Sequence, residues 1–337
     1  MKIPTDDIDT RILDLTQAEF PLYPAPFELI GKMLSIDEDD VLARIARMKS
    51  GGIIRQISAI FDSAALGYHS ALIAFKVSDE LLDRVAAGVS MHDSVSHCYS
   101  RDSDYNLWFT LTVPPECDLH AELATLTSLD GVMSHMLLPN VKVFKIGVIL
   151  KMSGGEQGAV SRKQTPDSSG GECRCVSAIP INMENQDFKT AVRALQTDLP
   201  LVSRPFACLA DAFDIPEDKL LNVAHRLLQN SVMRRYGAVL NHRMAGYTFN
   251  AMVCWFVSPD MIDEVGIRFS KHPSVSHCYQ RPTYPDWPYS IYTMIHARSQ
   301  EELDRIVADL VTISTNADHL VLTTLNEYKK QRVIYFP

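Results

Sequence analysis

The sequence Val-Ser-His-Cys-Tyr-Ser-Arg occupies residues 95–101 and returns as Val-Ser-His-Cys-Tyr-Gln-Arg at residues 275–281. Each copy brings an imidazole, a thiol, a phenol and a guanidinium together in a short stretch, and an aromatic-rich run follows it. A longer repeat surrounds the motif, because Pro26-Phe27 returns as Pro205-Phe206 and Gly67-Tyr68 as Gly246-Tyr247. The chain is therefore predicted to be a tandem duplication.

Each copy begins with a helical pattern and continues with a mixed one. Apolar residues at helical spacing predict three short helices, the third ending at Gly51-Gly52, and a strand follows at 53–57. This order is typical of a winged helix-turn-helix. Residues 70–148 then predict the order βαββαβ of a ferredoxin-like domain, with its last strand at 143–148. The predicted fold class is α+β, a tandem duplication of a winged helix-turn-helix plus a ferredoxin-like βαββαβ domain that forms a pseudo-twofold pair.

The domain boundaries follow from the same repeat. Residues 153–178 are rich in glycine and serine and are interpreted as a flexible linker between the two copies. The sequence places winged-helix-like domains at 1–57 and 179–236, and ferredoxin-like domains at 58–152 and 237–337.

The composition favours a cytoplasmic protein without a membrane segment. With 337 residues, 46% of them hydrophobic, the chain can form several compact domains. No apolar run approaches the ~20 residues that a membrane span needs. The first residues turn acidic where a signal peptide is apolar. Seven scattered cysteines suit reduced thiols better than a disulfide framework.

The charge distribution points to an anionic ligand rather than to nucleic acid. The net charge of −9 argues against a broad surface for nucleic acid. Residues 219–259 nevertheless contain no Asp or Glu, although five Lys or Arg residues fall among them. An acidic chain that keeps such a basic stretch is expected to bind an anion there.

A winged helix followed by a ferredoxin-like domain resembles the leucine-responsive regulator family, which is also called AsnC-like. In such regulators the third helix enters the major groove of DNA and needs cations for the phosphates. This helix starts with Asp37-Glu38-Asp39-Asp40 in the first copy and with Pro216-Glu217-Asp218 in the second. Because phosphates would repel these carboxylates, the sequence argues against DNA binding.

Several longer motifs resemble the siroheme decarboxylases. They lie at 232–239 and 276–289 in the second copy, at 104–111 in the first copy, and at the ending 328–336. The resemblance covers essentially the whole chain apart from the linker and implies a fusion of two subunits that are separate in other members. It also implies removal of CO2 from the two acetate side chains of siroheme. The product would be didecarboxysiroheme in alternative heme or heme d1 biosynthesis.

The second copy offers the groups that such a substrate needs. Siroheme is a flat, iron-bearing tetrapyrrole fringed with carboxylates, so its site must supply cations, apolar walls and a proton donor. The expected substrate-binding residues are Arg234, Arg235, Tyr236, Arg243, Arg281, Tyr284, Trp287 and Tyr289. The aromatic runs could equally belong to the core.

His277 is the first candidate for the proton donor, because histidine has the ordinary side-chain pKa nearest neutrality. Tyr279 and His242 are the alternative catalytic residues. Protonating the ring carbon that bears the acetate would turn the macrocycle into an electron sink, so no separate cofactor is expected beside the iron of the substrate. Two other interpretations of His277 stay open, an axial ligand of that iron and a hydrogen-bonded structural histidine. Cys278 is expected to be a small buried residue, because neighbours on a strand point to opposite faces.

The first copy lacks part of the arginine pattern. Arg55 corresponds to Arg234, but Gln56-Ile57-Ser58 stands where the second copy has Arg235-Tyr236-Gly237. The working site is therefore placed in the second copy. Supporting or degenerate-site roles are expected for Arg55, His97, Arg101, Tyr105 and Trp108. The alternative functions are a tetrapyrrole-binding sensor and an amino-acid-responsive transcriptional regulator. The sequence leaves open whether the fused chain forms further homo-oligomers.

Overall fold

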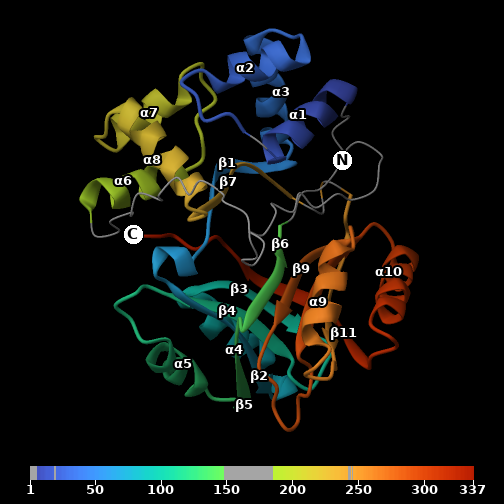
Figure 1. The fold of residues 1–337 in the computed structure, drawn as a ribbon. Helices are drawn as coiled ribbons and strands as arrows, with labels where there is room; N and C mark the ends of the chain where they lie inside the picture. The colour runs from blue at the N-terminus through green and yellow to red at the C-terminus, as the bar shows by residue number, and fades with distance from the viewer. Residues whose placement is uncertain (1–5, 19, 148–184, 242–243, 245) are drawn as a thin grey trace, which may run out of the picture. The chain divides into compact units, whose positions relative to one another are not determined.

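The computed structural model describes residues 6–18, 20–147, 185–241, 244 and 246–337. The chain forms two compact units. The first contains the described residues of 1–66, 149–245 and 334–337, and the second contains those of 67–148 and 246–333. The predicted linker at 153–178 lies outside the described residues. Each unit draws on both copies of the repeat, as the colours of Figure 1 show.

The first unit holds both helix-turn-helix segments. Its elements are α1 (Asp7–Ala18), α2 (Pro26–Leu34), α3 (Glu38–Ser50), β1 (Ile54–Phe61), η1 (Ala64–Leu66), α6 (Gln186–Gln196), α7 (Pro205–Ala212), α8 (Glu217–Gln229) and β7 (Met233–Leu240). Proline opens both α2 and α7, where its missing N–H costs no hydrogen bond. Strands β1 and β7 pair antiparallel, with Ile57 opposite Ala238. The two copies therefore share one two-stranded sheet.

In this unit the first helix of each copy packs on the strand of the other copy. Helix α1 lies against β7, and α6 lies against β1. The approach of α1 is close, because a Cβ atom added to Gly237 would overlap the carbonyl oxygen of Thr16 and lie 3.3 Å from that of Gln17. A glycine at position 237 therefore lets the two copies interlock.

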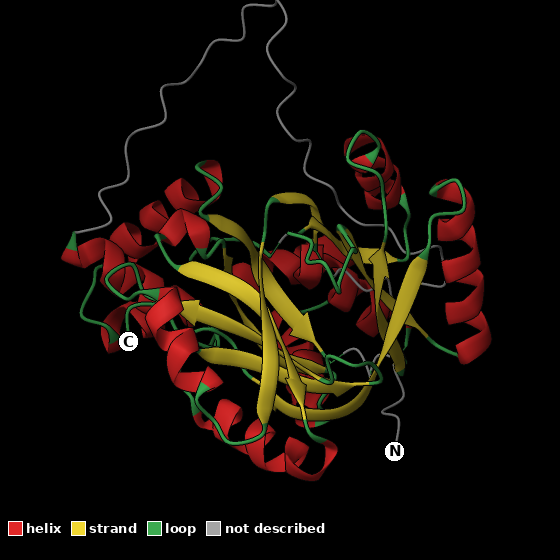
Figure 2. Cartoon of the chain, turned by 90° about the horizontal axis from the view of Figure 1, so that it is seen from below, coloured by secondary structure: helices red, strands yellow, loops and turns green. Residues whose placement is uncertain are grey.

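The second unit holds both ferredoxin-like segments. Its first-copy elements are β2 (His69–Val77), η2 (Asp79–Leu81), α4 (Leu82–Met91), β3 (Val95–Arg101), β4 (Leu107–Val113), α5 (Leu119–Thr127), β5 (Val132–Pro139) and β6 (Lys142–Ile146). Its second-copy elements are β8 (Phe249–Trp255), α9 (Ile262–Lys271), β9 (Val275–Gln280), β10 (Ile291–Ala297), α10 (Gln300–Ile313) and β11 (His319–Lys330). The strands form one sheet in the order β5-β2-β4-β3-β11-β8-β10-β9-β6, and Figure 2 shows helices outside the strands.

Each copy sends a strand across to the other copy. Residues His319–Thr323 of β11 pair with β8 in their own copy, and residues Thr324–Lys330 continue onto β3 of the first copy. In the first copy, two separate strands make the corresponding pairings. Strand β5 pairs with β2, and β6 pairs with β9 of the second copy. Pro139, which lacks an N–H for a further ladder bond, ends β5 before this crossing.

This pairing corrects the predicted last strand of the first ferredoxin-like domain. The fourth strand of that domain is β5, which the sequence pattern missed, and not the segment at 143–148. That segment does contain a strand, but the strand belongs to the edge beside β9. The predicted duplication and the predicted pseudo-twofold pair are confirmed, since corresponding strands of the two copies make corresponding pairings.

Three apolar clusters stabilise the second unit. One lies between the first-copy strands and their helices α4 and α5, and includes Phe75 and Phe109. Another lies between the second-copy strands and α9 and α10, and includes Trp255 and Phe269. The third joins the opposite faces of both copies, where the ring centroids of Trp108 and Trp287 lie 5.6 Å apart. The faces turned away from the helices therefore meet inside the unit.

In the part of the chain that the structure describes, no helix has the length and apolar character needed to cross a bilayer.

Candidate functional site

The repeated motif forms a row of stacked side chains on β9 and the residue that follows it. Cys278 points into the helix-side core and is fully buried, which confirms its predicted role as a small buried residue. His277, Tyr279 and Arg281 alternate with it and share the opposite face. The rings of His277 and Tyr279 stack with centroids 5.9 Å apart, and the Arg281 guanidinium carbon lies 4.9 Å from the Tyr279 centroid. Imidazole, phenol and guanidinium therefore follow one another in line.

The first copy repeats this row on β3. The rings of His97 and Tyr99 lie 6.2 Å apart, and the Arg101 guanidinium carbon lies 5.7 Å from the Tyr99 centroid. Cys98 between them is buried on the helix side, so this row also lies on the face shared by the two copies. In both rows the ring Nδ1 of the histidine lies 3.0 Å from the hydroxyl of the preceding serine. The second unit thus has two similar ends, the His97 row and the His277 row.

A buried arginine ends each row and reaches across to the other copy. Nη1 of Arg101 donates to the carbonyl oxygen of Leu322 at 3.0 Å, and Nη1 of Arg281 donates to that of Leu138. Both guanidinium groups are more than nine-tenths buried. Burial lowers the pKa of Arg281 and lowers the pKa of Arg101 to about 10.

These two guanidinium groups keep capacity for an anion. Among the described residues, Nε of Arg101 and Nε of Arg281 are buried without a hydrogen-bond partner. No carboxylate among those residues contributes to the pKa of either arginine. A buried cation without a counter-ion is unfavourable, and an incoming carboxylate would relieve that cost. The rows therefore end in groups suited to a carboxylate ligand.

The aromatic run after the motif packs between the two copies. Trp287 is 4% exposed and lies edge-on against Tyr105, with centroids 5.6 Å apart. Its Nε1 donates to the hydroxyl of Tyr292 at 2.8 Å. The Tyr284 hydroxyl donates to the carbonyl oxygen of Leu137 at 2.8 Å. These aromatic residues therefore hold the copies together, which was one of the two interpretations of the sequence.

Other aromatic side chains complete this packing. Tyr289 lies against Trp287 with ring centroids 5.0 Å apart. The Tyr105 hydroxyl donates to the Asp286 carboxylate at 2.8 Å, and Trp108 Nε1 donates to the Tyr105 carbonyl oxygen at 2.6 Å. The predicted supporting residues Tyr105 and Trp108 thus belong to the same cluster as the second-copy aromatics.

The strands beside the two histidines differ in chemistry. In register, Lys330 of β11 lies opposite His97, and Glu327 lies opposite Tyr99. At the corresponding places Ile146 of β6 lies opposite His277, and Val143 lies opposite Tyr279. Lys330 lies within the motif at 328–336, but no role was predicted for it or for Glu327, because both lie far along the chain from residues 95–101.

His296 is a further titratable group that sequence reasoning missed. It lies on β10 and is buried. Burial, together with the charge of Lys330, lowers its pKa from 6.5 to about 4. A neutral imidazole therefore lies within the electrostatic reach of the lysine that faces His97.

The remaining predicted residues belong to the first unit or lie outside the described chain. Arg234 forms an ion pair with Asp62 at 2.7 Å, and Arg235 donates to the carbonyl oxygen of Gln17 at the end of α1. Tyr236 is buried, 5.6 Å from Phe20 and 5.5 Å from Phe206 between ring centroids. Arg55 is exposed on β1. The predicted residues His242 and Arg243 lie outside the described residues.

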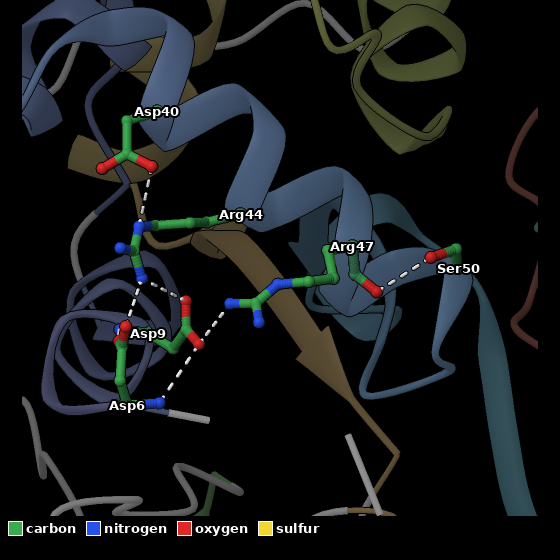
Figure 3. A network of polar contacts seen from close by, with 6 residues as sticks. All are labelled: Asp6, Asp9, Asp40, Arg44, Arg47 and Ser50. Atoms are coloured by element: carbon green, nitrogen blue, oxygen red, sulfur yellow. Dashed lines mark hydrogen bonds and ion pairs between the residues drawn. The ribbon is translucent and has the colours of Figure 1, made fainter. Parts of the chain in front are cut away.

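The helix that would read DNA has its arginines bound by carboxylates, as Figure 3 shows. Nη1 of Arg44 lies 2.7 Å from the Asp6 carboxylate and 3.0 Å from that of Asp9, and its Nε lies 2.9 Å from Asp40. Arg47 pairs with the same buried Asp9. Because these cations are already neutralised, they are poorly placed to bind phosphates.

A cavity of about 390 Å³ lies on the helix side of the second unit, between α10 and β11. Its walls include Leu303, Val307 and Val321. The His97 and His277 rows lie on the other face of the sheet, so this cavity is separate from them.

Two family models match the chain in duplicate. The AsnC-like ligand binding domain matches residues 65–145 and 244–329, and the siroheme decarboxylase NirDL-like HTH domain matches residues 9–55 and 188–234. The siroheme decarboxylase of Hydrogenobacter thermophilus is 36% identical over 327 residues, which cover 97% of this chain and 94% of that protein. The siroheme decarboxylase NirDL subunit of Paracoccus denitrificans is 31% identical over 306 residues, 90% of this chain and 89% of that subunit.

Separate subunits and solved structures give the same result. The siroheme decarboxylase beta subunit of Desulfovibrio desulfuricans is 39% identical over 149 residues, which cover 44% of this chain and 94% of that subunit. The crystal structure of the siroheme decarboxylase NirDL matches with a TM-score of 0.73 and 33% identity, covering 98% of this chain and 95% of that one. A second NirDL crystal structure, in complex with an iron-uroporphyrin III analogue, matches with a TM-score of 0.72 and 31% identity over the same shares. By sequence and by fold, the chain belongs to the siroheme decarboxylases in their fused NirDL form.

Proposed function

We propose that this protein is a carboxy-lyase that removes CO2 from the two acetate side chains of siroheme and yields didecarboxysiroheme. Membership of the siroheme decarboxylases supports this activity, as does the NirDL relative that binds an iron-uroporphyrin III analogue. The buried Arg281 is the observation that assigns the proposed reaction to particular residues. Its Nε has no hydrogen-bond partner among the described residues, and its guanidinium ends the row of His277 and Tyr279.

Each decarboxylation consumes one proton and no electrons. The acetate R–CH2–COO− takes up H+ and gives R–CH3 and CO2. Protonation at the acetate-bearing carbon itself, as expected from the sequence, would separate the acetate CH2 from the conjugated ring, so the proton must add to a ring position conjugated with that carbon. The ring then accepts the electron pair of the breaking C–C bond, CO2 leaves and an exocyclic methylene forms. Protonation of this methylene and loss of the ring proton give the methyl group, so one proton is consumed overall. The protein must therefore hold a carboxylate, deliver a proton and keep the ring in place.

The His277 row can supply these functions in order. Arg281 would bind a carboxylate at the fringe of the substrate through a charge-assisted hydrogen bond. Tyr279, which stacks between the arginine and the histidine, would support the edge of the ring. His277 would deliver the proton, because its ordinary pKa lies near neutrality. The apolar wall of Val143 and Ile146 beside this row would keep water away from the carboxylate.

Further parts of the proposal concern cofactors and compartment. The reaction needs no separate organic cofactor, since the ring itself is the electron sink and brings its own iron. In the second unit, the proposed contributors to substrate binding include Tyr284, Trp287 and Tyr289. The roles of Arg234, Arg235 and Tyr236 in the first unit, and of His242 and Arg243 outside the described residues, stay predictions from the sequence. The free thiols of Cys98, Cys254 and Cys278 agree with a reducing compartment, and we place the protein in the cytoplasm.

The test is anaerobic incubation of the purified protein with siroheme, followed by mass analysis of the tetrapyrrole and measurement of released CO2. The wild-type protein should release two CO2 per siroheme. His277→Ala should slow release about 100- to 10,000-fold, the range for loss of a general acid. Lys76→Met, an exposed change on β2, serves as a charge-altering control with unchanged activity.

Two outcomes would contradict the proposed activity, and a third would contradict the proposed role of His277. Binding of siroheme by the wild-type protein without any loss of CO2 would leave a tetrapyrrole sensor. Failure of siroheme to bind at all would remove the substrate assignment. A change in the visible spectrum of bound ferric siroheme in His277→Ala, with CO2 release intact, would instead make His277 an iron ligand.

A further inference from the structure

We propose that the His97 row is a second working subsite, in which Lys330 binds a substrate carboxylate beside His97. This inference rests on the proposed siroheme decarboxylase activity and extends it to the first copy, which the sequence had marked as supporting. The subsite is built by both copies, since His97 comes from β3 and Lys330 comes from β11.

The register of β11 on β3 puts the charged groups on the correct face. Residues that are directly opposite in an antiparallel pair have Cβ atoms about 4.5–5.5 Å apart on one face. Lys330 therefore lies beside His97, and Glu327 beside Tyr99. Lys329, between them, reaches the carbonyl oxygen of His92 on the helix side at 2.8 Å. Tyr328 also reaches the helix side, at Asp83 of α4, because the ladder is irregular between Glu327 and Lys329. Lys330, the next residue, therefore turns back to the face of the His97 row.

Lys330 forms a long ion pair with a neighbour on its own strand. Its Nζ lies 3.7 Å from the Glu327 carboxylate, which is longer than a direct hydrogen bond. The two side chains are 19% and 27% exposed, so they are partly shielded from water and remain within reach of a ligand. A substrate carboxylate could approach Lys330 and form a shorter, charge-assisted contact.

The charge of Lys330 also acts on the pKa of a second imidazole. Lys330 lowers the pKa of His296, a buried histidine on β10 of the second copy. His296 alternates along β10 with Ile295 and Ala297, which belong to the helix-side cluster, so it lies on the shared inner face. The His97 end itself combines an imidazole, an ammonium and the guanidinium of Arg101.

The His277 end has different neighbours. Ile146 and Val143 stand in the register positions of Lys330 and Glu327. The two ends thus offer unlike surroundings for the same kind of reaction. The substrate also presents two acetates that are not equivalent. At the His97 end the step is the same in atoms and electrons: H+ is taken up, the C–C bond breaks toward the protonated ring, and CO2 leaves.

Replacing Lys330 by methionine provides the test. Under anaerobic conditions with siroheme, Lys330→Met should accumulate a singly decarboxylated product, with the first CO2 released well before the second. The second release should slow about 10- to 100-fold, as expected for one lost charge-assisted contact. Lys330→Arg keeps the positive charge and should restore the doubly decarboxylated product. Lys76→Met, which removes an exposed lysine from the same unit, should leave both releases unchanged.

A second variant guards against a folding defect. His97→Gln should also accumulate the singly decarboxylated product, and thermal unfolding should show that both variants fold. The proposal is overturned if Lys330→Met and His97→Gln release both CO2 molecules at the wild-type rate. It is equally overturned if they slow both releases by the same factor, since one site would then serve both acetates. A wild-type protein that releases no CO2 would refute the siroheme activity itself, which distinguishes the two failures.

Discussion

Substitution of Gly266 by alanine tests the strand exchange that places β6 beside His277. Gly266 lies in the interior of α9, and the ring of Phe144 from β6 covers it. A Cβ atom added at this position would overlap the ring atoms Cε2 and Cζ and lie 2.6 Å from Cε1. Ordinary contacts between carbon atoms are about 3.5–4.0 Å. The ring, and the strand that carries it, would therefore have to move.

Two opposing terms set the sign of the effect. Alanine in place of glycine within a helix stabilises it by roughly 0.5–1 kcal/mol. Overpacking of a filled site costs about 1–3 kcal/mol. Gly88→Ala in α4 is the matched control, because its added Cβ would lie 3.4 Å from the Leu129 side chain, an ordinary contact. Gly88→Ala should raise the free energy of unfolding, and Gly266→Ala should lower it or leave it near the wild-type value.

Denaturant unfolding followed by tryptophan fluorescence is a suitable assay. All three tryptophans, Trp108, Trp255 and Trp287, belong to the second unit, so the signal reports on that unit. Phe144→Leu combined with Gly266→Ala should recover part of the loss, which a double-mutant cycle measures as coupling. If Gly266→Ala stabilises the protein as much as Gly88→Ala does, the packing of β6 on α9 is wrong.

Three further predictions follow from other parts of the chain. The pKa of His296 is about 4 in the folded protein, against 6.5 for an ordinary histidine. The stability that the neutral His296 contributes is therefore complete above pH 6.5, and on the order of 3 kcal/mol of it is lost as the pH falls toward 4. In thermal unfolding, His296→Gln should weaken this acid dependence. Gly237→Ala should destabilise the first unit by about 1–3 kcal/mol, because the added Cβ atom would overlap Thr16. Unfolding followed by circular dichroism measures this change, and an unchanged free energy of unfolding would mean that α1 does not pack on β7. Mobility-shift assays with duplex DNA should show no salt-sensitive complex at about tens of nanomolar protein, because carboxylates already pair with Arg44 and Arg47. The appearance of such a complex would contradict this pairing.

Local patterns predicted the elements well but not their partners. Alternation of side chains on a strand predicted that Cys278 is buried while His277 faces the other way, and the structure confirms the buried cysteine. The pairing of Lys330 with His97 joins residues far apart in the chain, and no local pattern carries that information. Strand β5 was missed because exposed residues, including Met133, Ser134 and His135, obscure its period.

Predictions made from the distribution of charge along the chain are limited in the same way. The absence of Asp and Glu from residues 219–259 suggested that Arg234 and the neighbouring basic residues bind an anionic ligand. In the structure Arg234 already has the carboxylate of Asp62, which belongs to the other copy and is brought to it by the pairing of β1 with β7. Counting charges along the chain therefore overestimates the free positive charge of that stretch. The buried Arg101 and Arg281 were recognised from their motif, but their lack of a carboxylate partner among the described residues required the fold.

The duplication gives the molecule a freedom that identical subunits do not have. In a symmetric homodimer both ends of the shared sheet must carry the same residues, because the twofold axis copies every contact. In this chain the corresponding register positions are occupied by Lys330 at the His97 end and by Ile146 at the His277 end. Separate alpha and beta subunits exist among the relatives, and fusion preserves the same inequality within one chain. Under the proposed two-subsite reaction, a substrate with two non-equivalent acetates would give that inequality a chemical use, since each end would suit a different carboxylate.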